Sequence, residues 1–329
     1  MNNRPTTRIK ILFITKLRSV YDDKSGATYT GLSSGLLNSS KFVADMLNAN
    51  GVEAKVVQVV DNNCIDREVA QYRPTHVVIE ALWVVPEKFA VLCKLHPTVK
   101  WFIRLHSNIP FVANEGMFSD WVTRYLDFGP NIHINVNAEE MFDDLKIVLK
   151  SKYALALDNF GNRVDVDARL SYLPNFYPLD KSKTRVVKAN KEFVDIGCFG
   201  SVRPMKNQLI QAVAAIGYAD SQKKRLRFHI NGGRNENNGS PVFKNLQQLF
   251  AEQPKHQLVV HQWMPHNEFV ELIRTMDVSC QVSFSETFNI VTADAVAQNV
   301  PVIVSKEIPW VSRFFWADVT SVSSQVNAI

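Results

Sequence analysis

Short apolar runs alternate with helix-forming and turn-forming segments along the first half of the chain. The runs that are rich in β-branched and aromatic residues predict β-strands at residues 9–15, 53–60, 75–82, 99–105 and 132–137. Residues 39–51 predict a helix between the first two strands, because their apolar side chains recur on one helical face. We expect Ser39 or Ser40 as its N-cap and Gly51 as its C-terminal stop.

The same alternation restarts in the second half of the chain. Strands are predicted at residues 194–200, 227–233, 256–264, 277–283 and 301–305. Helices are predicted at residues 207–219 and 266–276 and within 286–298. Strands that are separated by helices favour a parallel sheet in each half, and such sheets bind ligands outside the carboxyl ends of their strands.

The segment 173–193 joins the two series of strands. It contains two prolines and many charged residues, which is typical of an interdomain linker. We therefore predict an α/β protein with two doubly wound, Rossmann-like domains, residues 1–172 and residues 194–329, that face each other across a cleft. A length of 329 residues suits two domains of roughly 150 residues each.

Composition excludes several other classes of protein. Hydrophobic residues make up 46% of the chain and charged residues 21%, as in ordinary globular proteins. The four cysteines lack CxxC spacing, which disfavours a zinc site or a disulfide framework. The first apolar run is interrupted by Lys10 and followed by Lys16, and no run of about 18 apolar residues exists, so we expect a cytoplasmic protein without a membrane span. The net charge of +5 suits an anionic ligand or nucleic acid without deciding between them.

A loop after the strand at 194–200 carries the first candidate chemistry. Its sequence GSVRPMKN begins at Gly200 and places Arg203 and Lys206 just before a helix that starts near Asn207. Backbone N–H groups at a helix N-terminus and two nearby cations together suit a diphosphate. The alternative is that the two cations only solvate an exposed loop.

Two carboxylates lie eight positions apart in SFSETFNIVTADAVAQNVPVIVS, residues 283–305. A helix that starts near Thr287 would place Glu286 at its N-terminus, with Asp294 about two turns further along on roughly the same side. Thr287 and Asn289 would crowd the same N-terminus. Carboxylates in these places would accept hydroxyl groups of a sugar or a ribose. The alternative is a helix-start carboxylate and a buried capping partner.

These motifs together resemble GT-B glycosyltransferases, specifically the retaining family 4. Glu286, seven residues, Asp294 and then AVAQNVPVIVS resemble the E-x7-E signature and the A-x-A-x-G-x-P-V that follows it. The loop FGSVRPMKN resembles the diphosphate loop of that family, and YLPNFYP at 172–178 resembles its hinge. FHINGG at 228–233 resembles a further glycine-containing segment of the family.

The resemblance implies a nucleotide diphosphate sugar as the donor substrate, no other cofactor and no metal. Glu286 would hold hydroxyls of the donor sugar, and Asp294 would hold the ribose. Lys206 and Arg203 would bind the diphosphate and stabilise the leaving group. The further residues that the resemblance places at the donor are Gly200, Ser201, Gly232, Thr287, Phe288 and Asn289.

The sequence departs from the family pattern at several of these positions. Ser201 stands where an arginine is usual, and Asn289 and Asn299 each replace a glycine. Asp294 is one methylene shorter than the glutamate of the family. The sequence also ends soon after its last predicted strand, so helices that cross back to the first domain in GT-B chains would be trimmed or would lie outside it.

Two residues of the first half complete the candidate site. Gly35, in the Gly/Ser-rich segment 24–42, matches a family loop that faces the donor phosphate and the acceptor, whereas Gly26 and Gly31 suit ordinary turns equally well. His106 follows the strand at 99–105 and resembles the family histidine that touches the donor sugar. A lone histidine with a structural role is the alternative.

The resemblance implies a metal-independent transfer with retention to a hydroxyl acceptor, and the lack of a side chain that stands out as a nucleophile matches this mechanism. VVIEALWVVPEKF and KWFIRLHSNIPF resemble compact virus-borne GT-B enzymes, which implies 5-hydroxymethylcytosine in bacteriophage DNA as the acceptor. Aromatic residues that would stack on an exposed base, or else fill the core, are Trp83, Trp101, Phe102, Phe111, Phe118 and Trp121. The alternatives are a glycan or cell-envelope transferase and a non-catalytic sugar-nucleotide-binding module.

Overall fold

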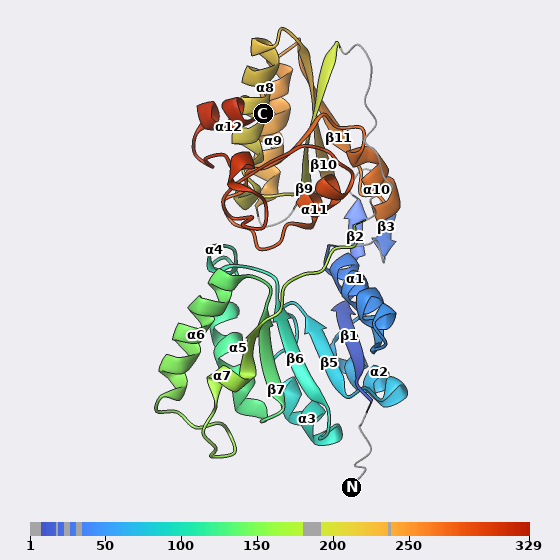
Figure 1. Cartoon of the computed structure of the whole chain (residues 1–329), viewed down its shortest axis with the longest axis vertical. Helices are drawn as coiled ribbons and strands as arrows, with labels where there is room; N and C mark the ends of the chain where they lie inside the picture. Colours follow the sequence, from blue (N-terminus) through green and yellow to red (C-terminus); the bar gives the residue numbers. More distant parts are fainter. Residues whose placement is uncertain (1–7, 18, 23–26, 31–34, 180–191, 236–237) are drawn as a thin grey trace. The chain divides into compact units, whose positions relative to one another are not determined.

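The computed structural model describes residues 8–17, 19–22, 27–30, 35–179, 192–235 and 238–329. The chain divides into two compact units, residues 1–18 with 34–177 and residues 19–33 with 178–329 (Figure 1). The division at Tyr177 lies within the segment predicted as the linker, whose residues 180–191 are outside the described ranges. The short antiparallel hairpin of β2 (Ser19–Asp22) and β3 (Ala27–Thr30) was not predicted.

The first unit is built on a six-stranded sheet in the order β4-β1-β5-β6-β7-β8, and every pair in it is parallel. Its strands are β1 (Lys10–Lys16), β4 (Glu53–Val59), β5 (His76–Glu80), β6 (Lys100–Leu105), β7 (Ile132–Val136) and β8 (Leu170–Tyr172). The five strands predicted from apolar runs are thus confirmed. Strand β8 was missed because it is only three residues long with a single buried side chain, which is too short for a pattern.

The helices of the first unit are α1 (Gly35–Ala49), α2 (Ile65–Tyr72), α3 (Lys88–Leu95), α4 (Ile109–Val112), α5 (Phe118–Arg124), α6 (Glu139–Tyr153) and α7 (Val166–Arg169). The predicted cap at Ser39 or Ser40 is wrong, because α1 already begins at Gly35. Both serines are buried inside the helix, and the Ser40 hydroxyl donates to the carbonyl of Leu36. Gly51 is confirmed as the stop, with a left-handed φ of +81°.

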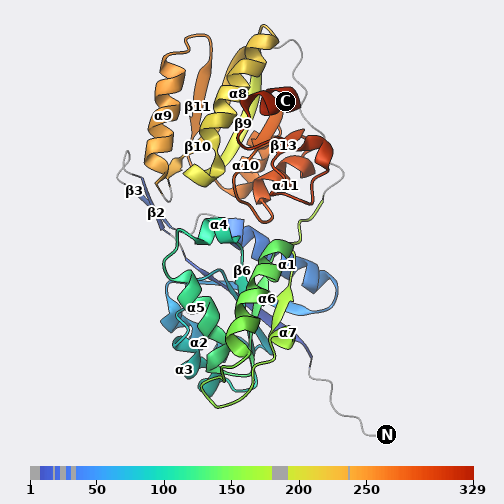
Figure 2. The same ribbon diagram turned by 90° about the vertical axis from the view of Figure 1, so that its left-hand side faces the viewer.

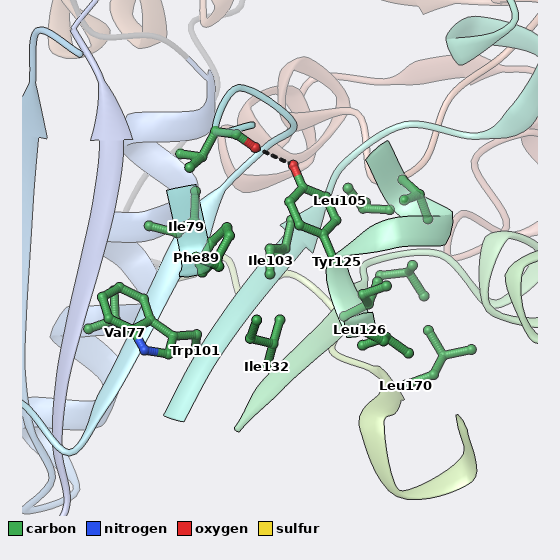
Figure 3. Packing of buried hydrophobic residues seen from close by; sticks show 14 of the residues in the cluster. Val77, Ile79, Phe89, Trp101, Ile103, Leu105, Tyr125, Leu126, Ile132 and Leu170 are labelled. Carbon is green, nitrogen blue, oxygen red and sulfur yellow. Dashed lines mark hydrogen bonds between the residues drawn. The ribbon is translucent and has the colours of Figure 1, made fainter. Parts of the chain in front are cut away.

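The core of the first unit follows from the alternation of side chains along its buried strands. Leu12 and Ile14 join one cluster, whereas Phe13 between them joins a cluster on the other face of the sheet with α1. Figure 3 shows the larger cluster, in which the Tyr125 hydroxyl donates to the carbonyl of Val84. Of the six aromatic residues considered for base stacking, Trp101 and Phe118 are buried members of the larger cluster. The other four are half-buried and pack against the two clusters, namely Trp83, Phe102, Phe111 and Trp121.

The second unit contains a five-stranded parallel sheet in the order β11-β10-β9-β12-β13 (Figure 2). Its strands are β9 (Phe193–Val202), β10 (Arg225–Asn235), β11 (Gln257–His261), β12 (Val278–Gln281) and β13 (Val302–Val304). All five were predicted. The strand order runs outward in opposite directions from the β9–β12 pair, which makes this pair the topological switch point of the sheet.

The helices of the second unit are α8 (Gln208–Ser221), α9 (Gly239–Ala251), α10 (His266–Ile273), α11 (Ile290–Ala297) and α12 (Val322–Ala328). Helices α8, α9 and α12 pack with Ile196, Phe228 and Cys280 of the sheet. Helices α10 and α11 pack in a separate cluster with Phe199 and Val302. Helices therefore cover both faces of a parallel sheet, which confirms the predicted α/β, doubly wound architecture.

Candidate functional site

The loops that follow β9 and β12 meet at the switch point of the second unit. The two strands are neighbours, with Ile196 paired to Val278. The backbone N–H of Phe284, after β12, donates to the carbonyl of Met205, after β9, at 2.9 Å. The Asn207 amide adds a second link, since its Nδ2 donates to the carbonyl of Val282 at 3.0 Å. The sequence-predicted diphosphate loop and the Glu286 loop thus form one local structure.

Lys206 and Glu286 form an ion pair within this structure. Lys206 Nζ lies 2.5 Å from Glu286 Oε1, and the two side chains are only 10% and 8% exposed. Gly200 lies beside the lysine, since a Cβ at this position would be in van der Waals contact with Lys206 Cε at 3.5 Å. Gly200 also has a φ of +110°, a backbone conformation that residues other than glycine rarely adopt. The structure therefore brings together three of the predicted site residues.

Two buried glutamines of helix α8 hold the same loop in place. Gln208 Nε2 donates to the carbonyl of Ser201, and Gln208 Oε1 accepts from the N–H of Arg203. Gln211 Nε2 donates to the carbonyl of Lys206 at 2.7 Å, and its Oε1 accepts from the first N–H after β12. Sequence reasoning missed both residues, although polar amides at i and i+3 of an otherwise apolar helix are a signal that their backbone partners lie nearby.

Helix α11 begins at Ile290, so the prediction of a helix start near Thr287 is wrong. Asn289 explains the difference, because its φ of +54° is left-handed and cannot continue a right-handed helix. Its Oδ1 instead accepts from the N–H of Thr292 at 2.9 Å and caps α11. Glu286 therefore lies in the loop before the helix and not in its first turn.

The two asparagines that replace family glycines both have left-handed backbone conformations. The φ of Asn289 is +54° and that of Asn299, just after α11, is +56°. Asparagine is among the few non-glycine residues that tolerate this region. Both replacements therefore keep the backbone path that glycine allows.

Replacing Asn289 separates its backbone conformation from its side-chain hydrogen bonds. Asn289→Ala removes the cap and the buried bond from Asn289 Nδ2 to Gln281 Oε1 and leaves a β-carbon in a left-handed conformation, so we expect a loss of about 3–4 kcal/mol in unfolding free energy. Asn289→Gly loses the same hydrogen bonds but relieves the backbone, so its loss should be smaller by about 1–2 kcal/mol. Urea unfolding of the two variants measures the difference. Equal losses in both would show that the left-handed conformation is not what selects asparagine here.

Asp294, the second carboxylate of the motif, is paired with a histidine that sequence reasoning missed. Asp294 in α11 is 1% exposed, and its Oδ1 lies 2.7 Å from Nε2 of His266, the first residue of α10. The side chain of His266 is 24% exposed. Asp294 is therefore buried, and its predicted contact with the ribose stays a prediction.

Phe288 and Gly232 have structural partners that account for their identity. The Phe288 ring stacks on Trp310 with centroids 5.4 Å apart, and Trp310 Nε1 donates to the Phe288 carbonyl at 2.7 Å. A Cβ on Gly232 would lie 2.2 Å from Val260 Cγ1, so close packing requires glycine there. The predicted donor contacts of both residues stay predictions.

His106 in the first unit is held by Glu80, the last residue of β5. His106 Nε2 lies 2.5 Å from Glu80 Oε2, and Glu80 Oε1 accepts from Arg104 Nη1 at 3.2 Å. Burial would raise the pKa of Glu80, but the charge of Arg104 and the hydrogen bonds from Arg104 and His106 hold it below its usual value. Burial lowers the pKa of His106. A neutral ring that donates from Nε2 can accept a hydrogen bond at Nδ1, and Nδ2 of Asn137 lies 3.4 Å from this nitrogen.

The predicted site residues therefore fall into two groups. His106 and Gly35, the first residue of α1, belong to the first unit, and the remaining predicted residues belong to the second. Gly26 and Gly31 lie outside the described residues. Among the residues that the structure describes, no group of three or more His, Cys, Asp or Glu side chains could hold a metal ion. Nor does any helix in the described ranges have the length and apolarity needed to cross a membrane.

Comparison with known protein families gives a match in the second half of the chain. Residues 180–324 match the family model of Glycosyl transferases group 1. The matched segment contains both loops of the switch point and the Asp294–His266 pair. No curated protein sequence matches the chain.

Solved structures resemble the chain over nearly its whole length. Anabaena HepE, in complex with UDP and glucose, has a TM-score of 0.59 at 12% identity and covers 97% of this chain and 88% of its own. Sucrose-phosphate synthase from Thermosynechococcus elongatus has a TM-score of 0.61 at 12% identity with the same coverages. A UDP-forming α,α-trehalose-phosphate synthase from Burkholderia vietnamiensis has a TM-score of 0.58 at 7% identity, covering 97% and 90%. The chain has the GT-B fold of two Rossmann-like α/β domains, and its residues 180–324 match the Glycosyl transferases group 1 family.

Proposed function

We propose that the protein is a retaining glycosyltransferase that uses a nucleoside diphosphate sugar as donor. The observation that carries this proposal is the contact of Lys206 with Glu286 at the switch point between β9 and β12. Ligands of parallel sheets bind at this place. The match of residues 180–324 to a glycosyltransferase family and the UDP bound by HepE support the same class of ligand.

The chemistry of the pair suits the two halves of such a donor. An ammonium group has three N–H donors, so Lys206 can bind Glu286 and a phosphate oxygen together. A carboxylate accepts several hydrogen bonds, so Glu286 can hold sugar hydroxyls beside the lysine. Because the two side chains are 10% and 8% exposed, the field of Lys206 on a diphosphate is screened little by water.

In the proposed reaction, the bond between the anomeric carbon and the β-phosphate oxygen breaks, and a bond from the same carbon to the acceptor oxygen forms on the same face. The acceptor proton passes to the leaving phosphate oxygen. Lys206 and Arg203 would stabilise the charge that develops on the diphosphate, while Glu286 and His106 would orient the sugar. No metal is part of this proposal.

The acceptor we propose is the hydroxyl of 5-hydroxymethylcytosine in viral DNA, and its support is the sequence resemblance alone. The six aromatic residues that would stack on a base are buried in the core clusters or pack against them, and they lend this acceptor no support. A glycan acceptor is the competing proposal. Salt-sensitive binding to duplex DNA would favour the nucleic acid, because phosphate contacts impose a steep salt dependence.

A panel of nucleotide sugars tests the donor and the acceptor together. Each donor is incubated with hydroxymethylated DNA, with unmodified DNA and without acceptor, and nucleosides and released nucleotide are measured by mass spectrometry. We expect one donor to yield a glycosylated nucleoside. Nucleotide release without any modified nucleoside would refute DNA as the acceptor but would still support an enzyme that cleaves the donor. Donor binding without nucleotide release in any reaction would instead support a non-catalytic sugar-nucleotide-binding module.

A further inference from the structure

His266 and Asp294 form a hydrogen-bonded pair between helices α10 and α11. Asp294 is one methylene shorter than the glutamate of the family pattern, so its carboxylate lies closer to helix α11. His266, at the first position of α10, lies 2.7 Å from that carboxylate across 28 residues of sequence. The Asp294 side chain is 2% exposed, whereas that of His266 is 24% exposed. A ligand that approaches this pair from solvent therefore meets the imidazole first.

We propose that His266 is a positioning residue that orients Asp294 and completes a subsite for the ribose of the donor. The proposal rests on the proposed function, in which Asp294 holds the ribose. A buried carboxylate needs hydrogen-bond donors, and His266 Nε2 supplies one at Oδ1. Since a carboxylate offers about four acceptor positions, this bond is compatible with a hydroxyl donor at another position.

The ribose contact in this proposal is made by Asp294, and His266 acts on it through the bond from Nε2 to Oδ1. The specificity expected of this pair is for a nucleotide with ribose hydroxyls over one that lacks them.

Binding of UDP and of its 2′,3′-dideoxy analogue, measured by calorimetry, tests this assignment, with the ADP and GDP pairs run in parallel. The wild-type protein should prefer the ribonucleotide that it binds over the dideoxy form. His266→Ala should weaken ribonucleotide binding about 10- to 100-fold, the range for hydrogen bonds to charged groups, and leave dideoxy binding almost unchanged. In turnover, the same variant should raise KM for the donor and change kcat much less.

Two further variants distinguish positioning from simple loss of structure. His266→Gln should retain most of the preference, because its amide N–H can replace Nε2–H. His266→Ala combined with Asp294→Glu should recover much of the lost affinity, because the longer carboxylate reaches the ribose directly. His96→Ala is the matched control, since His96 Nε2 lies the same 2.7 Å from Asp66 in the first unit.

The outcomes separate this inference from the proposed function. If the wild-type protein binds none of the nucleotides, the donor assignment itself is wrong and the ribose subsite with it. If the wild-type protein binds a ribonucleotide and His266→Ala binds it equally well, only the role of His266 is refuted. If His266→Ala loses affinity for the ribonucleotide and for the dideoxynucleotide to the same extent, a ribose-specific role is also refuted.

Discussion

Lys206→Ala is expected to lower kcat/KM for donor turnover by about 100- to 1,000-fold, the effect of removing one preorganised donor from a developing negative charge. The proposed transfer leaves a diphosphate behind, and Lys206 is a buried cation at the switch point, with its side chain 10% exposed. In bulk water the attraction between its ammonium group and a phosphate would be weak, but the attraction is stronger where water is largely excluded. Arg203 in the same loop should sustain the residual activity.

The control for this prediction is Lys255→Ala in the same unit. Lys255 pairs with Asp220, but both side chains are 49% exposed, so the variant should keep its activity within about twofold. Because Lys206→Ala also leaves Glu286 without this partner, the melting temperature of each variant must be recorded beside its kinetics. A folded Lys206→Ala variant with wild-type turnover would refute the role of the lysine in stabilising the leaving group.

Arg104→Ala is expected to destabilise the first unit by about 3–5 kcal/mol, as for other buried pairs that lose one partner. Both Arg104 and Glu80 have side chains with no exposed surface. Arg104 Nη2 also donates to the carbonyls of Leu173 at 3.4 Å and Pro174 at 3.1 Å and to Oδ1 of Asn175 at 2.6 Å. The variant therefore leaves one fully buried carboxylate and three partly buried acceptors without this donor.

Hydrogen exchange of peptides from β5, β6 and β7 during urea titration measures this loss in the first unit separately from the second. Arg67→Ala is the control, because Arg67 is 65% exposed in its pair with Glu68 and should change stability by less than about 1 kcal/mol. Glu80→Gln combined with Arg104→Met should recover part of the loss, since no buried charge is then left alone. A loss below about 1 kcal/mol for Arg104→Ala would contradict the prediction.

The contribution of Glu80 to the unfolding free energy of the first unit is expected to decrease as the pH falls. The pKa of Glu80 is lower in the fold than in the unfolded chain, where it is about 4.3. The folded state therefore binds fewer protons in this range, and the contribution of Glu80 is complete above that unfolded value and lost as the pH falls through the folded pKa. The stability difference between the wild-type protein and Arg104→Ala should shrink correspondingly in acid.

Most of the strands and the motifs of the candidate site could be predicted from local sequence. The run Lys10–Lys16 became β1 because β-branched and aromatic side chains suit a strand that is buried on both faces. Asn289 shows where local prediction fails. The sequence around it suits a helix from Thr287 onward, but its left-handed φ delays the helix to Ile290. The φ angle of one residue depends on the conformation of the loop that contains it. Helix propensity, which is a property of the local sequence, does not predict that angle.

By itself, the sequence determined two α/β series, the loop with Lys206 and the carboxylates at 286 and 294, because periodicity and short motifs act over a few residues. Only the tertiary structure decided which of these groups touch. Lys206 meets Glu286 across 80 positions, and His266 meets Asp294 across 28. Such partners are chosen by strand order and by the packing of helices on the sheet, which depend on contacts between distant segments and leave no local pattern in the chain.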